Sequence, residues 1–198
     1  MISEKSMELQ KINVKFFVEK GNKMPLADLI PVFHRWIQQD KLEGMLIDVT
    51  EYTHVHQGPG VLLIANEANY SLDETDGKRG LLYNQKRVPV KSGEEHLRTA
   101  FRRALQACSL LEKEPEVAGK MKFAVNHLQV FINDRLAGPN NAEGHQDLEN
   151  DLKPFLNSLY EGAGHLLIPE KDPKKRTGFE VKVDKAFELE DLLEKLSH

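Results

Sequence analysis

Two histidines one residue apart, His54 and His56, are the side chains whose type and spacing are best suited to chemistry. On a β-strand, residues i and i+2 point to the same side, so two imidazole rings could share a metal ion or act as acid/base groups. Glu67 is the nearby carboxylate that would complete such a set, and Asp48 and His34 are alternative third metal ligands. We predict His54, His56 and Glu67 as candidate catalytic residues, with His54 and His56 as an alternative metal site.

A second candidate site is basic. Residues 78–103 hold eight cations and two carboxylates, a local charge of +6. Arg98 and Arg102 are four residues apart in a predicted helix, so they share a face and could hold a phosphate or carboxylate. The alternative is a solvated helix face whose cations pair with acids elsewhere. The residues predicted to bind the anion, on this helix and the hairpin before it, are Arg79, Arg87, Arg98, Arg102 and Tyr70.

Composition narrows the class of protein. The 198 residues are 40% hydrophobic and 29% charged, as in an ordinary globular protein. A net charge of −4 argues against nucleic-acid binding by the whole surface, which needs a cationic field. Cys108 is the one cysteine, which favours a reducing compartment. No apolar run resembles a signal peptide or a membrane span, so we expect a cytoplasmic protein without membrane contact.

The elements that must position these residues follow from periodicity. Alternating and β-branched runs predict strands at 12–19, 44–49, 60–67, 123–134, 164–169 and 178–183, and a further hairpin turning at Asp76 and Gly77. Apolar stripes at helical spacing predict helices at 24–39, 92–113, 147–160 and the C-terminus. Ser92 and Glu95 form a capping box that begins the second helix.

The two halves of the chain resemble each other. "DLIPVFHRWI" aligns with "DLKPFLNSLY", which places Pro31 over Pro154. Glycine-led strands follow at similar distances, so that the strand at 60–67 corresponds to the one at 178–183. Proline is costly inside a helix, and two such residues at one offset suggest an internal duplication rather than chance.

The predicted fold class is therefore α+β. Two βαββ-type units, residues 1–115 with the extra hairpin and residues 116–198, would form one globular domain with a mostly antiparallel sheet and helices packed on one face. Some parallel pairing is allowed by the strand–helix–strand order. The histidines fall in the connection "TEYTHVHQGP", whose counterpart in the second unit is "EKDPKKRT". These connections differ between the units, and functions are often placed on such loops.

The segments "PVFHRWIQ" and "GPGVLLIANEANYSLD" resemble a family of bacterial hypothetical proteins, and the resemblance covers most of the chain. It implies a bacterial cytosolic setting and carries no activity, ligand or catalytic residue.

Three functional hypotheses remain. The first is a cytoplasmic binding protein for a small anionic ligand or a protein partner. The second is a metal-dependent or acid/base enzyme that uses His54, His56 and Glu67. The third is a structural protein that forms homo-oligomers through the leucine-rich last helix. No cofactor and no nucleic-acid partner is expected.

Overall fold

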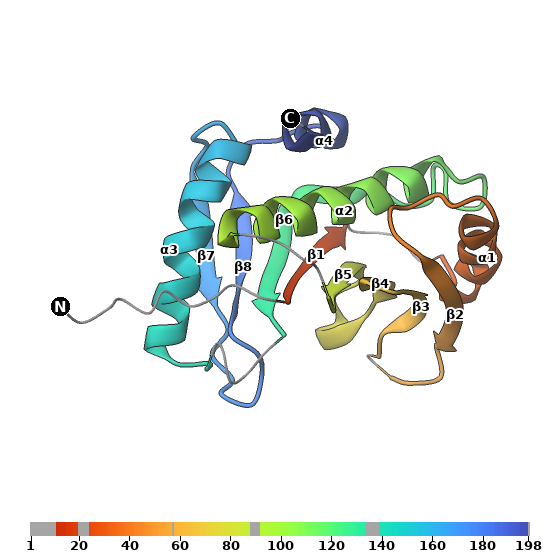
Figure 1. Ribbon diagram of the computed structural model, residues 1–198, viewed down its shortest axis with the longest axis horizontal. Helices are drawn as coiled ribbons and strands as arrows, with labels where there is room; N and C mark the ends of the chain where they lie inside the picture. The colour runs from red at the N-terminus through yellow and green to blue at the C-terminus, as the bar shows by residue number, and fades with distance from the viewer. Residues whose placement is uncertain (1–10, 20–23, 57, 88–91, 134–138, 198) are drawn as a thin grey trace.

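The computed structural model describes residues 11–19, 24–56, 58–87, 92–133 and 139–197. It has an α+β fold in which eight strands form one sheet, in the order β2-β3-β4-β5-β1-β6-β8-β7 (Figure 1). All seven strand pairings between the described residues are antiparallel. The parallel pairing that the sequence allowed does not occur among them, and β1 joins β6 directly, so both halves of the chain contribute to one sheet.

The observed elements follow the predicted order. The strands are β1 (Ile12–Val18), β2 (Leu46–Tyr52), β3 (Gly60–Ala65), β4 (Ala68–Asp73), β5 (Gly80–Gln85), β6 (Phe123–Ile132), β7 (His165–Pro169) and β8 (Gly178–Val183). The α-helices are α1 (Ile30–Gln38), α2 (Gly93–Lys113), α3 (Ala142–Leu159) and α4 (Leu189–Ser197). Short 3₁₀ turns, η1 (Leu26–Leu29) and η2 (Thr75–Gly77), precede α1 and join β4 to β5.

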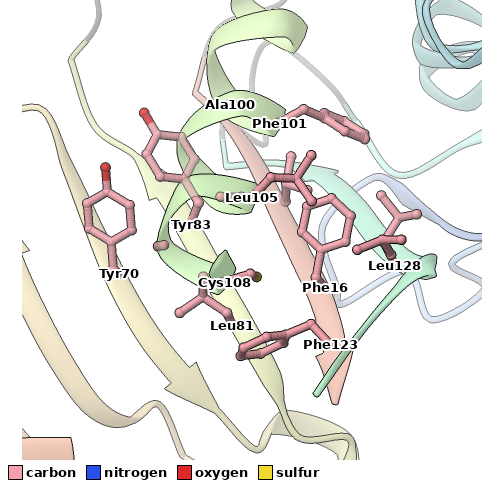
Figure 2. Close-up of a cluster of buried hydrophobic side chains, with 14 of the residues drawn as sticks. Phe16, Tyr70, Leu81, Tyr83, Ala100, Phe101, Leu105, Cys108, Phe123 and Leu128 are labelled. Atoms are coloured by element: carbon pink, nitrogen blue, oxygen red, sulfur yellow. The ribbon is translucent and has the colours of Figure 1, made fainter. Parts of the chain in front are cut away.

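The helices pack on one face of the sheet. Phe16 of β1 points toward α2, where the Phe101 ring meets that of Phe16 edge to face at 5.9 Å between centroids (Figure 2). Val14 is two residues earlier on the strand, so it lies on the same face, and it is buried. Phe101 also contacts Phe155 of α3 at 4.8 Å. Cys108 points from α2 into the same apolar cluster, where burial raises the pKa of its thiol well above the ordinary value.

The opposite face of the sheet is polar. The alternate residues of β1 are Asn13, Lys15 and Phe17, and all three are buried. The register places Asn84 of β5 beside Asn13 and Gln129 of β6 beside Lys15. Side chains alternate between the two faces of a strand, so these residues lie on the side away from α2. A polar face with a buried lysine at its centre is unusual, because an isolated buried charge is costly.

Two helices begin later or earlier than predicted. Helix α1 begins at Ile30 rather than at residue 24, after the 3₁₀ turn η1. Helix α3 begins at Ala142, five residues earlier than predicted, because Asn141 caps it by accepting a hydrogen bond from Gly144 N at 2.9 Å. Pro154 therefore lies inside α3. Pro31 lies in the first turn of α1, where a backbone N–H would have no partner within the helix, so proline costs no hydrogen bond there. The two prolines that carried the repeat argument occupy different helical positions.

The structure does not show an internal duplication. Strand β8 pairs with the central strand β6, whereas β3 pairs with β2 and β4. The place beside central strand β1 is taken by β5, which begins at Gly80. A Cβ on Gly80 would lie 2.5 Å from Phe16 O, and one on Gly178 would lie 2.5 Å from Val130 O. By position in the sheet, Gly178 thus matches Gly80 rather than Gly60.

Candidate functional site

The polar face of the sheet is hollowed into a groove. Two adjoining hollows of about 430 and 420 Å³ lie over β1, β6 and β5. The residues that line both hollows are Thr75, Asp76, Gln129, Glu170 and Lys175. These volumes fall in the range of small-molecule sites. We call this hollow the sheet groove, and define it by the residues that line either hollow.

Lys15 lies on the floor of the sheet groove with 2% of its surface exposed. Its Nζ donates to Asp73 Oδ1 at 2.5 Å, and Asp73 also accepts from Thr75 N and Thr75 Oγ1. Burial lowers the pKa of Lys15 from its ordinary value, although the Asp73 carboxylate opposes that change. The floor is thus a desolvated ammonium group held by a carboxylate.

Two loops form the rim. The β4–β5 loop leaves the sheet beside the Phe17 end of β1, whereas β8 begins at the level of Asn13. The loops nevertheless meet over the sheet, because Lys175 Nζ of the β7–β8 loop lies 2.7 Å from Asp76 Oδ2 of the β4–β5 loop. In the β7–β8 loop, the guanidinium of Arg176 lies 5.5 Å from the centre of the Phe131 ring. The rim is therefore rich in lysine and arginine and includes an aromatic surface.

A histidine and a glutamate lie beside the floor. His127 Nε2 is 2.8 Å from Glu180 Oε1, and Lys78 Nζ is 2.5 Å from Glu180 Oε2. The His127 ring packs against Phe17 at 4.6 Å between centroids. Burial alone would raise the pKa of Glu180, but the hydrogen bonds from Lys78 and His127 prevail and lower the pKa to about 2.

Replacing Glu180 with glutamine should lower the free energy of unfolding at neutral pH by about 1–2 kcal/mol, a value reduced because Lys78 is half exposed. The pKa of Glu180 is about 2 in the folded protein and 4.5 without the fold, so its stabilising contribution is complete above pH 4.5 and is lost as the pH falls toward 2. Urea unfolding of both proteins from pH 7 to pH 2.5 measures this. A difference between wild type and Glu180→Gln that stays constant down to pH 2.5 would show that Glu180 is not held by these partners.

The structure does not bring the predicted catalytic residues together. His54 and His56 are exposed in the turn after β2, next to the Tyr52–Gly60 end of the β2–β3 hairpin. Glu67 follows Ala65, which pairs with Leu46 at the other end of that hairpin. The two ends are separated by the length of β3, on the order of 20 Å at about 3.3 Å per residue. The prediction of a joint site of the two histidines with Glu67 is therefore wrong.

Glu67 instead belongs to an ionic cluster under α2. Its Oε2 lies 2.7 Å from Arg103 Nη1, and Arg102 donates to the carboxylate of Glu43. The rings of Tyr70 and Tyr83 lie 5.3 Å apart beside this cluster (Figure 2). Burial raises the pKa of both tyrosines. Three residues predicted for two different sites, Glu67, Tyr70 and Arg102, thus meet in one place.

The predicted arginine clamp is occupied by internal partners. Arg98 Nη1 donates to Lys195 O of α4 at 3.2 Å, while Arg102 is held by Glu43. Arg79 Nε donates to Glu74 at 2.8 Å and its Nη1 donates to Met24 O. Arg87 is exposed beside the end of β5. These contacts match the alternative reading of the basic stretch, cations that pair with acids elsewhere.

The residues of the sheet groove were missed as a site, although two signals were present. Lys15 interrupts the otherwise apolar strand "INVKFFV", which is uncommon for a central strand. The second signal is the connection "EKDPKKRT", which carries four cations, whereas the candidate site was predicted in its counterpart with the histidines. Nothing in the sequence indicates that Lys175 reaches Asp76, because the contact joins residues 99 positions apart.

The described residues contain no group of three or more histidine, cysteine, aspartate or glutamate side chains arranged to hold a metal ion. In the same part of the chain, no helix is long and apolar enough to cross a membrane. Comparison of the chain with protein-family models, with curated proteins and with solved structures finds no match.

Proposed function

We propose that the protein is a cytoplasmic binding protein for a small anionic ligand, and that the ligand lies in the sheet groove rather than on the predicted arginine pair of α2. The observation that carries the proposal is Lys15, a buried ammonium group on the floor of a ligand-sized hollow. An anion above it would find hydrogen-bond donors on the amides of Asn84 and Gln129.

The charge of the lining supports an anion. The cations are Lys15, Lys78, Lys171, Lys174, Lys175 and Arg176, and the carboxylates are Asp73, Asp76, Glu170 and Glu180. Six cations against four carboxylates make a local charge of +2 in a chain of net charge −4. The concave shape strengthens the field that a bound anion experiences, because the surrounding protein has a lower dielectric constant than water.

The test is an anion-dependent rise in melting temperature. Inorganic phosphate, citrate and adenosine monophosphate are added at constant ionic strength, so that screening does not change. A ligand present at ten times its dissociation constant stabilises the fold by about 1.4 kcal/mol. For a chain of this size that corresponds to a rise of about 3–6 °C. The variant K174Q/K175Q/R176Q is expected to lose most of this rise.

The matched control is R98Q/R102Q, which removes the cations of the helix predicted from sequence. Its basal melting temperature should fall, because Glu43 loses its partner Arg102, but its response to the anion should remain. A response that is lost in R98Q/R102Q and kept in the loop variant would move the site to α2. No response to any of the three anions in wild type would remove the proposal.

An acid/base enzyme is the second candidate, and one observation favours it. His127 is oriented by Glu180 at 2.8 Å beside the sheet groove, the arrangement expected of a general base with its orienting carboxylate. Such an enzyme would use His127 rather than His54 and His56. It would require turnover that His127→Gln abolishes while the anion-dependent rise in melting temperature is retained.

A further inference from the structure

Most of the large apolar side chains that are exposed among the described residues lie in or beside edge strand β2. Among these residues, five large apolar side chains are exposed: Met45, Ile47, Tyr52, Val55 and Leu166. Four of the five lie in or beside β2, and Met45 and Ile47 have 69% and 53% of their surface exposed. A local concentration of this kind on a protein surface marks an interaction site more often than scattered apolar residues do.

Among the described residues, the outer side of β2 has no neighbouring strand, although helix α1 packs against β2. Strand β2 is the first in the order of the sheet, and among the described strands only β3 pairs with it. The Val49 N–H donates to Asp48 Oδ1 at 2.8 Å, so a side chain rather than a neighbouring strand satisfies this group. Unpaired backbone groups along an exposed strand are a template for the addition of another strand.

The charge on this edge points to a basic partner. Between Lys41 and Lys78 the chain holds seven carboxylates and no lysine or arginine. Five of the seven form ion pairs inside the protein: Glu43, Glu67, Asp73, Glu74 and Asp76. Within the described residues the other two, Asp48 and Glu51, have no cation partner, and both are exposed on β2. The register pairs Asp48 with Ile64 and Glu51 with Val61, so the two carboxylates point to opposite faces of the sheet. Uncompensated carboxylates beside apolar side chains complement an apolar segment with two cations three residues apart.

The other edge of the sheet differs. Strand β7 ends at Pro169, which cannot donate to a neighbouring strand, and the basic loop "EKDPKKRT" follows it. Proline and lysine are the usual means by which proteins block a sheet edge. Strand β2 has neither residue.

From these observations we infer that β2 is a docking edge for an extended, mostly apolar segment of a partner protein that carries two cations three residues apart. The segment adds to the sheet as a ninth strand. Its backbone carbonyl replaces Asp48 as the acceptor of the Val49 N–H, and its cations pair with Asp48 and Glu51. Its apolar side chains cover Met45 and Ile47. This surface is separate from the sheet groove, so either proposal can fail without the other.

The probe is a capped heptapeptide of valine with lysine at its second and fifth positions, titrated into the ¹⁵N-labelled full chain. Saturable shifts of backbone amides in 45–55, with Val49 and Glu51 among the largest, are the expected result. Two control peptides separate the contributions. Glutamate in place of both lysines tests the charge, and glycine in place of every valine tests whether strand-forming apolar side chains are needed. Both controls should bind at least tenfold more weakly.

The variant D48K/E51K should weaken the valine–lysine peptide at least tenfold, whereas Leu166→Ser on the opposite edge should leave its affinity unchanged. Both substitutions are at exposed positions, and the melting temperature of each variant verifies the fold. The inference is overturned by no saturable shift at millimolar peptide. It is also overturned if the glycine–lysine peptide binds equally well, because the attraction is then general, or if D48K/E51K binds like wild type.

Discussion

Replacing Lys15 with methionine is expected to lower the free energy of unfolding by about 3–5 kcal/mol at pH 7. Asp73 is only 4% exposed, and in the variant its carboxylate would stay buried without the ammonium group that lies 2.5 Å away in the wild type. The donors on Thr75 remain, but they do not neutralise the charge. Equilibrium unfolding in urea, followed by circular dichroism, measures the change.

The double variant K15M/D73N is the control for this prediction. It removes both charges together, and it should recover much of the lost stability because no uncompensated charge remains. If Lys15→Met alone unfolds at the wild-type urea concentration, Lys15 is not a buried, paired cation, and the floor of the sheet groove is described wrongly.

Phe101→Ala is expected to lower the free energy of unfolding by about 3–5 kcal/mol, because the missing ring leaves a cavity. The ring is fully buried between β1 and α3, where it meets Phe16 and Phe155. Phe101 is the only phenylalanine, tyrosine or tryptophan of α2, so the variant loses the ring contact between α2 and α3. Urea unfolding at pH 7 gives the difference directly.

Phe131→Ala is the matched control, since it removes the same side chain from the other face of the sheet. Phe131 is partly exposed in the sheet groove, so its loss should cost only about 1 kcal/mol. Phe131→Ala should also reduce the anion-dependent rise in melting temperature, because Phe131 lines the sheet groove. Phe101→Ala should leave that rise unchanged. Equal destabilisation by the two variants would contradict the assignment of one covered and one open face.

Local features of the fold were predictable because they depend on local sequence. Ser92 accepts from Glu95 N and begins α2 where the capping box indicated. The hairpin between β4 and β5 turns at Asp76 and Gly77, both with positive φ. In contrast, the start of α3 was missed because Asn141 caps a polar turn that precedes its apolar stripe.

The order of strands was not predictable from local pattern. Whether β3 or β5 lies beside β1 depends on long-range pairing, and glycine-led strands of similar composition satisfy the same local rules. The comparison of Pro31 with Pro154 failed for a related reason, since a residue's position in a helix depends on where the helix begins.

The candidate site was the least predictable feature. Spacing in sequence joined His54 and His56 with Glu67, but the two strands of a hairpin carry such residues to opposite ends. The basic residues of α2 could not be distinguished from a ligand site, because their partner Glu43 lies 59 residues away. The sheet groove depends on contacts between β1, β4 and the β7–β8 loop, which no single stretch of sequence contains.

The most direct test of the central claim is a titration of the ¹⁵N-labelled protein with citrate at constant ionic strength, followed by backbone and side-chain amide resonances. The account predicts saturable shifts at the side-chain amide of Gln129 and the backbone amides of Lys175 and Arg176, with α2 unaffected near Arg98 and Arg102. Shifts confined to α2, or no saturable change anywhere, would contradict it.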